Sequence, residues 1–175
     1  PNAEFSCFEN APIHSLKNSE KAILYRLRTM TDDEFESLPY GSEGLWRKLM
    51  HASRGCNAME EIISATKSKR YTRTRIDRMI LCAFLGLTTE DLSAPAPYAR
   101  VLAFSDKGRE VLKAARKQAT IPLITKPAHA FDLGGDARVI FEREALACDL
   151  YNLALPCWKD LRWGDDWRQD AIYVK

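Results

Sequence analysis

Apolar residues in the first half of the chain recur every three or four positions, which is the period of an α-helix. Five such stretches follow one another, and each begins close to a residue that favours a helix N-terminus: Ser19, Thr31, Ser42, Asn57 and Thr72. Glycine and proline between the stretches supply the breaks. The pattern therefore predicts a helical bundle over residues 19–93, behind an irregular lead-in over residues 1–18.

The pattern changes after Pro95-Ala96-Pro97, where two short runs rich in β-branched and aromatic residues flank a helical stretch. These predict a strand over 98–104, a helix over 106–118 and a strand over 121–125. Gly134-Gly135-Asp136 then precedes a long amphipathic helix, from about Ala137 to Leu155, and a last strand is predicted over 171–174. The predicted core residues of the long helix are Leu146, Leu150 and Leu153. We therefore expect a mostly α member of the α+β class, with a small mixed subdomain and a long C-terminal helix over residues 94–175.

Length and composition indicate where the protein is located and which kinds of site it lacks. The chain has 175 residues, is 46% hydrophobic and contains no apolar run near the roughly 20 residues that span a bilayer, so we expect no membrane contact. It begins with Pro1 and no basic, apolar leader, from which we expect a piece of a longer cytoplasmic protein. The five cysteines form no C-x-x-C pair and are predicted to be unpaired thiols, with Cys82 and Cys148 buried. No Cys and His spacing indicates zinc, and no residue is singled out as catalytic.

Positive charge is concentrated in one place, which we call the basic segment: residues 67–78. It holds six basic residues and one acid, Asp77, so it carries +5, whereas the chain as a whole carries +2 and the remainder −3. Clustered Lys and Arg bind phosphates, whereas scattered charge mainly keeps a protein in solution. The predicted RNA- or phosphate-binding residues are Lys67, Lys69, Arg70, Tyr71, Thr72, Arg73, Arg75 and Arg78.

Individual residues of the basic segment have different predicted roles. Tyr71 offers a ring on which a base could stack, and Thr72 is predicted to cap a helix whose first backbone N–H groups would face a phosphate. Arg75 and Arg78 stand three positions apart, so they should share the outward side of that helix. A solvated helix start without a ligand is the competing interpretation.

The basic segment, together with Glu43-Gly44-Leu45-Trp46-Arg47-Lys48-Leu49, resembles the C-terminal region of the tRNA(Met) cytidine acetate ligases. Further matches in the same order are Tyr25–Arg28, Pro97–Phe104, Lys107-Gly108-Arg109, Ile121–Lys126 and Ala171–Lys175. The resemblance implies a cytosolic bacterial enzyme that uses ATP, with Mg, to activate acetate and acetylate the wobble cytidine of elongator tRNA(Met).

The resemblance also implies that ATP and tRNA are bound by different domains. In this family a nucleotidyltransferase domain holds ATP with His-x-Gly-His and Ile-Ser-Ala-Thr motifs, and we expect this chain to lack that domain and both motifs. The chain would then be the tRNA-binding C-terminal domain, with tRNA and its own N-terminal catalytic domain as partners, and not a catalyst alone. Two alternatives stay open: a basic wall of a composite ATP site, and a structural or homo-oligomerisation module.

Overall fold

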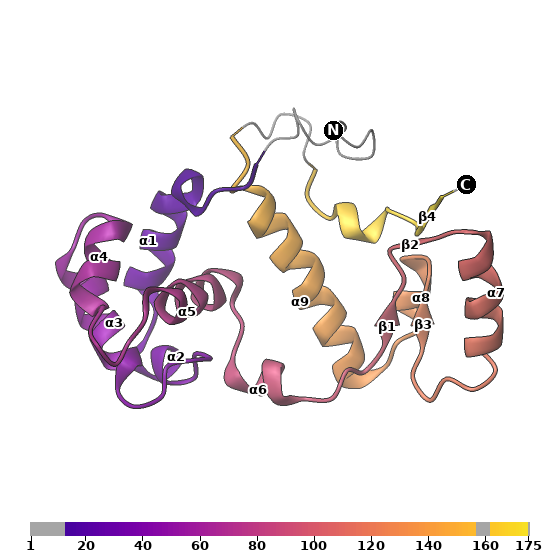
Figure 1. Ribbon diagram of the computed structural model, residues 1–175, viewed down its shortest axis with the longest axis horizontal. Coiled ribbons are helices and arrows are strands. Elements are labelled where there is room, and N and C mark those ends of the chain that lie inside the picture. The colour runs from indigo at the N-terminus through magenta and orange to yellow at the C-terminus, as the bar shows by residue number, and fades with distance from the viewer. Residues whose placement is uncertain (1–12, 157–161, 175) are drawn as a thin grey trace. The chain divides into compact units, whose positions relative to one another are not determined.

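The computed structural model describes residues 13–156 and 162–174 and is a mostly helical α+β fold (Figure 1). The described residues divide into two compact units, of which the first contains residues 13–93 and 150–156 and the second residues 94–149 and 162–174. The fold class predicted from the sequence is therefore confirmed. Within the described ranges, no helix is long and apolar enough to cross a membrane.

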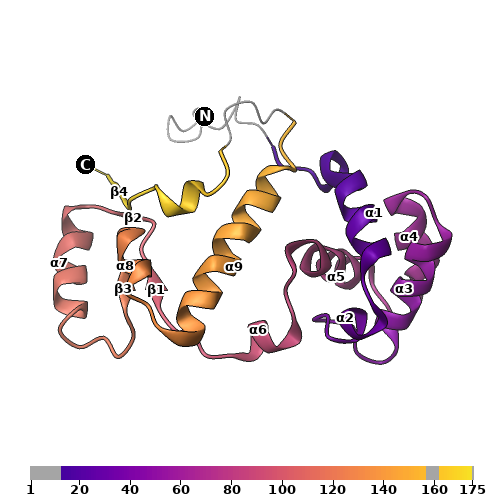
Figure 2. The same ribbon diagram turned by 180° about the vertical axis from the view of Figure 1, so that it is seen from behind.

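The first unit is a bundle of short helices, which Figure 2 shows from behind. The five predicted helices are present, and a 3-10 turn, η2, and a short helix, α6, were not predicted. The elements in chain order are η2 (Leu16–Ser19), α1 (Glu20–Thr29), α2 (Asp32–Glu36), α3 (Leu45–Gly55), α4 (Met59–Thr66), α5 (Arg73–Leu85) and α6 (Thr89–Ser93).

Local capping explains where two of these helices begin. Thr31 and Glu34 form a reciprocal capping box at α2, and the Thr72 hydroxyl accepts a hydrogen bond from the Arg75 backbone N–H at α5. The cap predicted at Asn57 is wrong, because Ala58 occupies the N-cap position of α4. Acceptors for the α4 N-terminus come instead from acidic side chains: Glu20 Oε1 accepts from the Met59 N–H at 2.7 Å.

The core of the first unit fixes the orientation of α5. Ile76 and Met79 of α5 are fully buried, together with Leu45 and Leu49 of α3 and Ile23 of α1. Burying a side chain of this size stabilises the fold by about 1.5–3 kcal/mol. Because one face of α5 is anchored in this way, its opposite face must carry the arginines.

The second unit is built on very short parallel strand pairs. Its elements are β1 (Ala99–Arg100), β2 (Ala103–Phe104), α7 (Asp106–Ala115), β3 (Leu123–Ile124), α8 (Ala128–Phe131), α9 (Gly135–Asn152, whose last residues belong to the first unit), η3 (Asp165–Trp167) and β4 (Ile172–Tyr173). β1 pairs with β3 and β2 pairs with β4, both in parallel. The single strand predicted over 98–104 is thus divided, because its first part bonds to one neighbour and its last part to another.

Several core predictions for the long helix are wrong. Leu146 and Leu153 are 48% and 45% exposed. Leu150 is partly buried and packs against the core of the first unit, so its prediction is confirmed in part. The buried stripe of α9 is carried by Phe141 and Ala145 instead, which are 0% and 1% exposed. The stripe lies one position from Leu146, and on a helix one position is a rotation of about 100°.

The structure also places two cysteines and two tryptophans. Cys82 is buried as predicted, whereas Cys148 is exposed. In the C-terminal tail, Trp167 packs edge-on against Phe141 with ring centroids 4.7 Å apart, and Trp163 is 76% exposed.

Candidate functional site

The basic segment connects the end of α4 to the first turns of α5. Two hydrogen bonds close a turn in this loop: the Tyr71 N–H donates to Ser68 Oγ and the Ser68 N–H donates to the Tyr71 carbonyl, both at 3.2 Å. Thr72 then caps α5 as predicted. A capped helix N-terminus of this kind combines backbone donors with the positive end of the helix dipole, and both favour a bound anion.

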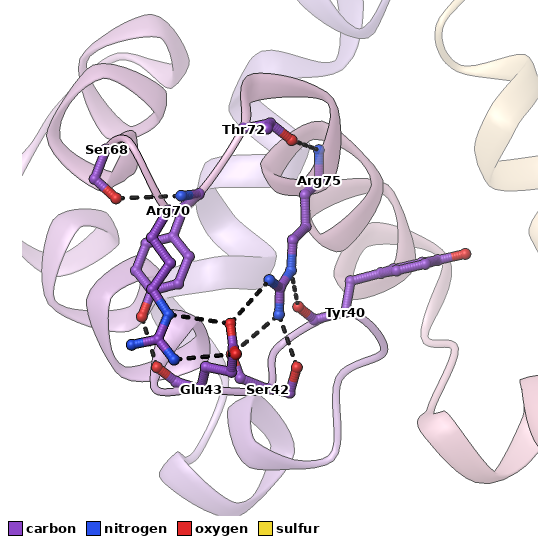
Figure 3. Close-up of polar contacts among 8 residues, drawn as sticks. Tyr40, Ser42, Glu43, Ser68, Arg70, Thr72 and Arg75 are labelled. Atoms are coloured by element: carbon purple, nitrogen blue, oxygen red, sulfur yellow. Dashed lines mark hydrogen bonds and ion pairs between the residues drawn. The ribbon is translucent and has the colours of Figure 1, made fainter.

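One carboxylate holds two arginines of the basic segment, and we call this arrangement the Glu43 clamp: Glu43, Arg70 and Arg75. Arg70 Nη2 lies 3.0 Å from Glu43 Oε1, and Arg75 Nη1 lies 3.4 Å from Glu43 Oε2 (Figure 3). The hydrogen bond and charge of Arg70, followed by those of Arg75, lower the pKa of Glu43. Two guanidinium groups converging on one pair of oxygens is an arrangement that also suits a phosphate.

Arg75 also ties the clamp to the loop between α2 and α3. It donates to the Tyr40 carbonyl at 2.8 Å, to the Ser42 carbonyl at 3.1 Å and to Ser42 Oγ at 2.7 Å. Tyr40 and Glu43 have φ angles of +66° and +62°, which side chains with a Cβ rarely adopt. Such residues cost of order 1–3 kcal/mol each unless the surroundings hold them. The Arg75 hydrogen bonds supply that support.

Tyr71 is also part of this support. Its side chain is 9% exposed, and its hydroxyl donates to the Glu43 carbonyl at 2.6 Å. Two cations lie near its ring: Lys48 Nζ is 6.0 Å from the ring centroid, and the Arg75 guanidinium carbon is 5.8 Å from it. The predicted stacking of a base on Tyr71 is therefore inconsistent with the structure, because little of the ring faces solvent.

The other cations of the basic segment fall into two groups. Arg73 is neutralised by Glu60, with which it forms two hydrogen bonds, and lies 3.6 Å from Asp77. Lys67, Lys69 and Arg78 have no carboxylate within ion-pair distance among the described residues. Arg78 lies over the Tyr40 ring at 5.9 Å, so Arg75 and Arg78 reach the same residue, in keeping with their shared side of α5.

Sequence reasoning missed Glu43 because it lies 27 and 32 positions from its two arginines. The available signal was the position of Glu43 in the stretch used for the family resemblance. No group of three His, Cys, Asp or Glu residues in the described ranges could hold a metal ion.

The chain was compared with known families, proteins and structures. The family model HIGH Nucleotidyl Transferase matches residues 1–162. The tRNA(Met) cytidine acetate ligase of Acetivibrio thermocellus is 31% identical over 160 residues, covering 85% of this chain and 37% of that protein. The ligase of the same name from Clostridium acetobutylicum is 40% identical over 108 residues, covering 59% of this chain and 27% of the relative.

A solved structure has the same fold. The crystal structure of Thermotoga maritima TmcAL bound with alpha-thio ATP matches with a TM-score of 0.78 and 26% identity, covering 92% of this chain and 42% of that one. The chain thus spans less than half the length of these relatives.

These findings correct two predictions. The nucleotidyltransferase domain was expected to be absent, with the chain a C-terminal region only, but the nucleotidyl transferase model matches nearly the whole chain. The expectation that the chain lacks an Ile-Ser-Ala-Thr motif is also wrong, because Ile63-Ser64-Ala65-Thr66 directly precedes the basic segment. These four residues form the last turn of α4, and Ile63 and Thr66 are buried. The match over residues 1–162 shows that the chain belongs to the HIGH nucleotidyl transferase family.

Proposed function

We propose that this chain belongs to an ATP-dependent enzyme that modifies tRNA, and that its basic segment binds phosphates of the tRNA backbone. The relatives named tRNA(Met) cytidine acetate ligase support acetylation of a cytidine in tRNA(Met) as the reaction. The alpha-thio ATP in the Thermotoga maritima structure supports ATP as cosubstrate. Elongator tRNA(Met), the wobble position and Mg enter the proposal from the family resemblance alone. A cytoplasmic location remains part of the proposal, and the unpaired Cys56, Cys82 and Cys148 are compatible with it.

The observation that carries the proposal is the distribution of charge within the basic segment. Lys67, Lys69 and Arg78 lack carboxylate partners among the described residues, so their charge is available to a polyanion. Arg70 and Arg75 are held by a carboxylate, and guanidinium groups that bind a carboxylate can also bind a phosphate. The segment therefore combines cations that attract RNA with preoriented guanidinium groups that can bind it.

The experiment is a salt titration of tRNA binding by the full 175-residue chain. Each phosphate contact contributes about 0.7 to 0.9 to the slope of log K against log salt. Replacing Lys69 and Arg78 with Ala should therefore reduce the slope by about 1.4 to 1.8. Lys21→Ala with Arg168→Ala removes two charges elsewhere and serves as the matched control. An unchanged slope in the first variant would count against the proposal.

A second candidate is binding of the ATP triphosphate by the same cations. The alpha-thio ATP in the Thermotoga maritima structure favours it, as does the capped N-terminus of α5. Calorimetric titration of ATP into the same two variants distinguishes the candidates. If the Lys69 and Arg78 substitutions abolish ATP binding and leave tRNA binding intact, the segment serves ATP.

A further inference from the structure

The second unit contains a cationic hollow that the proposed function has not used. It has a volume of about 320 Å³ and is lined by Phe104, Arg109, Leu112, Lys113, Arg116 and Thr125. We call it the α7 hollow, because four of these residues lie on α7 or directly after it. It belongs to a different unit from the basic segment.

Charge around the α7 hollow is strongly positive. Residues 106–126 contain six basic residues and two acidic ones, a net charge of +4. One of the acids, Asp106, accepts a hydrogen bond from the Tyr173 hydroxyl at 2.7 Å and lies 3.9 Å from Arg109. Lys113 and Arg116 have no carboxylate within ion-pair distance in the part of the chain that the structure describes. The positive field of the hollow is therefore less neutralised than that of the basic segment.

The two arginines of the α7 hollow are already positioned. Arg116 Nη2 donates to Thr125 Oγ1 at 3.0 Å, and the Arg109 guanidinium carbon lies 4.9 Å from the Tyr173 ring centroid. Both are surface contacts that leave guanidinium donors unused. Gly108 allows α7 to approach β2 closely, since a Cβ there would lie 3.3 Å from Phe104 Cβ. The cations are thus held on a helix that rests directly on the sheet.

The shape of the array indicates the kind of ligand. Arg109, Lys113 and Arg116 are four and three positions apart, so they follow one side of the helical path over a rise of about 10 Å. A row of cations suits successive phosphates of a chain better than a single phosphate, which needs donors that converge. Leu112 and Phe104, both half-buried, supply apolar surface that can contact a ribose or a base.

We propose that the α7 hollow is a second RNA-binding surface, which contacts the sugar–phosphate backbone of the same tRNA as the basic segment. This inference rests on the proposed function, and it assigns an RNA contact to the second unit. It requires Lys113 and Arg116 to contribute to RNA affinity independently of Lys69 and Arg78.

The test compares two variants of the same segment in the full chain. Lys113→Ala with Arg116→Ala removes two cations of the α7 hollow, whereas Lys107→Ala with Lys117→Ala removes two cations nearby that do not line it. Fluorescence anisotropy with labelled tRNA(Met) transcript, at a series of salt concentrations, is the measurement. We expect the slope of log K against log salt to fall by about 1.4 to 1.8 in the first variant and by clearly less in the second. Far-UV circular dichroism verifies that both are folded.

Each other outcome overturns the inference in a distinguishable way. If the Lys113/Arg116 variant and the Lys107/Lys117 variant bind tRNA with the same slope of log K against log salt, the α7 hollow is not an RNA site. The proposed function then stands if the Lys69 and Arg78 substitutions still weaken tRNA binding. If the unmodified chain shows no salt-dependent tRNA binding, both proposals fail. If the Lys113 and Arg116 substitutions weaken binding of tripolyphosphate and leave tRNA binding unchanged, the hollow binds a small anion instead.

Discussion

Substitution of Glu43 by Gln should strengthen RNA binding by the basic segment. Glu43, Arg70 and Arg75 together carry a charge of +1, and the substitution raises it to +2. Gln has the same length and retains an oxygen that accepts from a guanidinium, so the positive-φ loop keeps its support from Arg75. The change therefore removes a competing anion and little else.

The size of the effect follows from counterion release. With Glu43 in place, the clamp carries a net charge of +1 and can neutralise one phosphate, whereas the +2 charge of the Glu43→Gln variant can neutralise two. Removing that carboxylate should steepen the slope of log K against log salt by about 0.7 on a single strand and about 0.9 on a duplex. Because Arg70, and then Arg75, lower the pKa of Glu43, the carboxylate stays ionised at neutral pH and the comparison holds there.

The assay is anisotropy of labelled tRNA at several salt concentrations, with Glu142→Gln as the matched control. Glu142 pairs with Arg138 on α9 at 2.8 Å, so this variant has the same change in net charge at a site outside the basic segment. Binding that is unchanged or weaker in a folded Glu43→Gln variant would refute the role given to the clamp. An equal gain in both variants would assign the effect to net charge.

Three further predictions concern side chains that stabilise the fold of the two units. Tyr71→Phe removes the hydroxyl that donates to the Glu43 carbonyl, and should cost about 1 kcal/mol in urea unfolding and weaken tRNA binding. Phe141→Ala opens a cavity beneath α9 and should cost about 3–5 kcal/mol, also measured by urea unfolding; a loss below 1 kcal/mol would contradict its role as the core of the second unit. Burial acts to raise the pKa of Asp166, but hydrogen bonds led by that of Arg100 outweigh it and lower the pKa. The ionised Asp166 carboxylate therefore contributes its full stabilisation above the unfolded pKa near 4, and this contribution is lost as pH falls through the lower folded pKa. Unfolding measured as a function of pH should show that Asp166→Asn removes this loss of stability in acid.

The sequence predicted the helices of the first unit well because their signals are local. Thr31 with Glu34 and Thr72 mark helix starts within a few residues, and the apolar period continues directly behind them. The helix at Met59 was predicted with the wrong cap: Glu61 accepts from the Ala58 N–H, and the Met59 N–H donates to Glu20, 39 positions away. Capping by a distant side chain leaves no local signal.

The second unit was harder to predict for two physical reasons. Its strands are only two residues long, too short for a period of two to define which side chains face inward. On α9, apolar residues lie on more than one side of the helix: Leu146 and Leu150 share one side, and Phe141 and Ala145 share another. Apolar spacing alone therefore could not identify the buried stripe. Packing against α8 and the C-terminal tail decides it, through contacts such as Phe141 with Trp167.

The two cationic surfaces differ in how their charge is restrained, and this difference has a functional consequence. In the basic segment, carboxylates hold three of the arginines, so an anion must displace a partner before it binds them. In the α7 hollow, Arg116 is positioned by a neutral hydroxyl, and Arg109 lies on an aromatic ring with one ionic partner, Asp106, at 3.9 Å. An anion therefore has fewer and longer ion pairs to displace there. We therefore expect the hollow to attract polyanions weakly and without selectivity, and the clamp to favour an anion whose oxygens can take the place of the Glu43 carboxylate. Under the proposed function, the second unit is thus expected to contribute attraction for RNA, and the clamp in the first unit is expected to contribute selectivity.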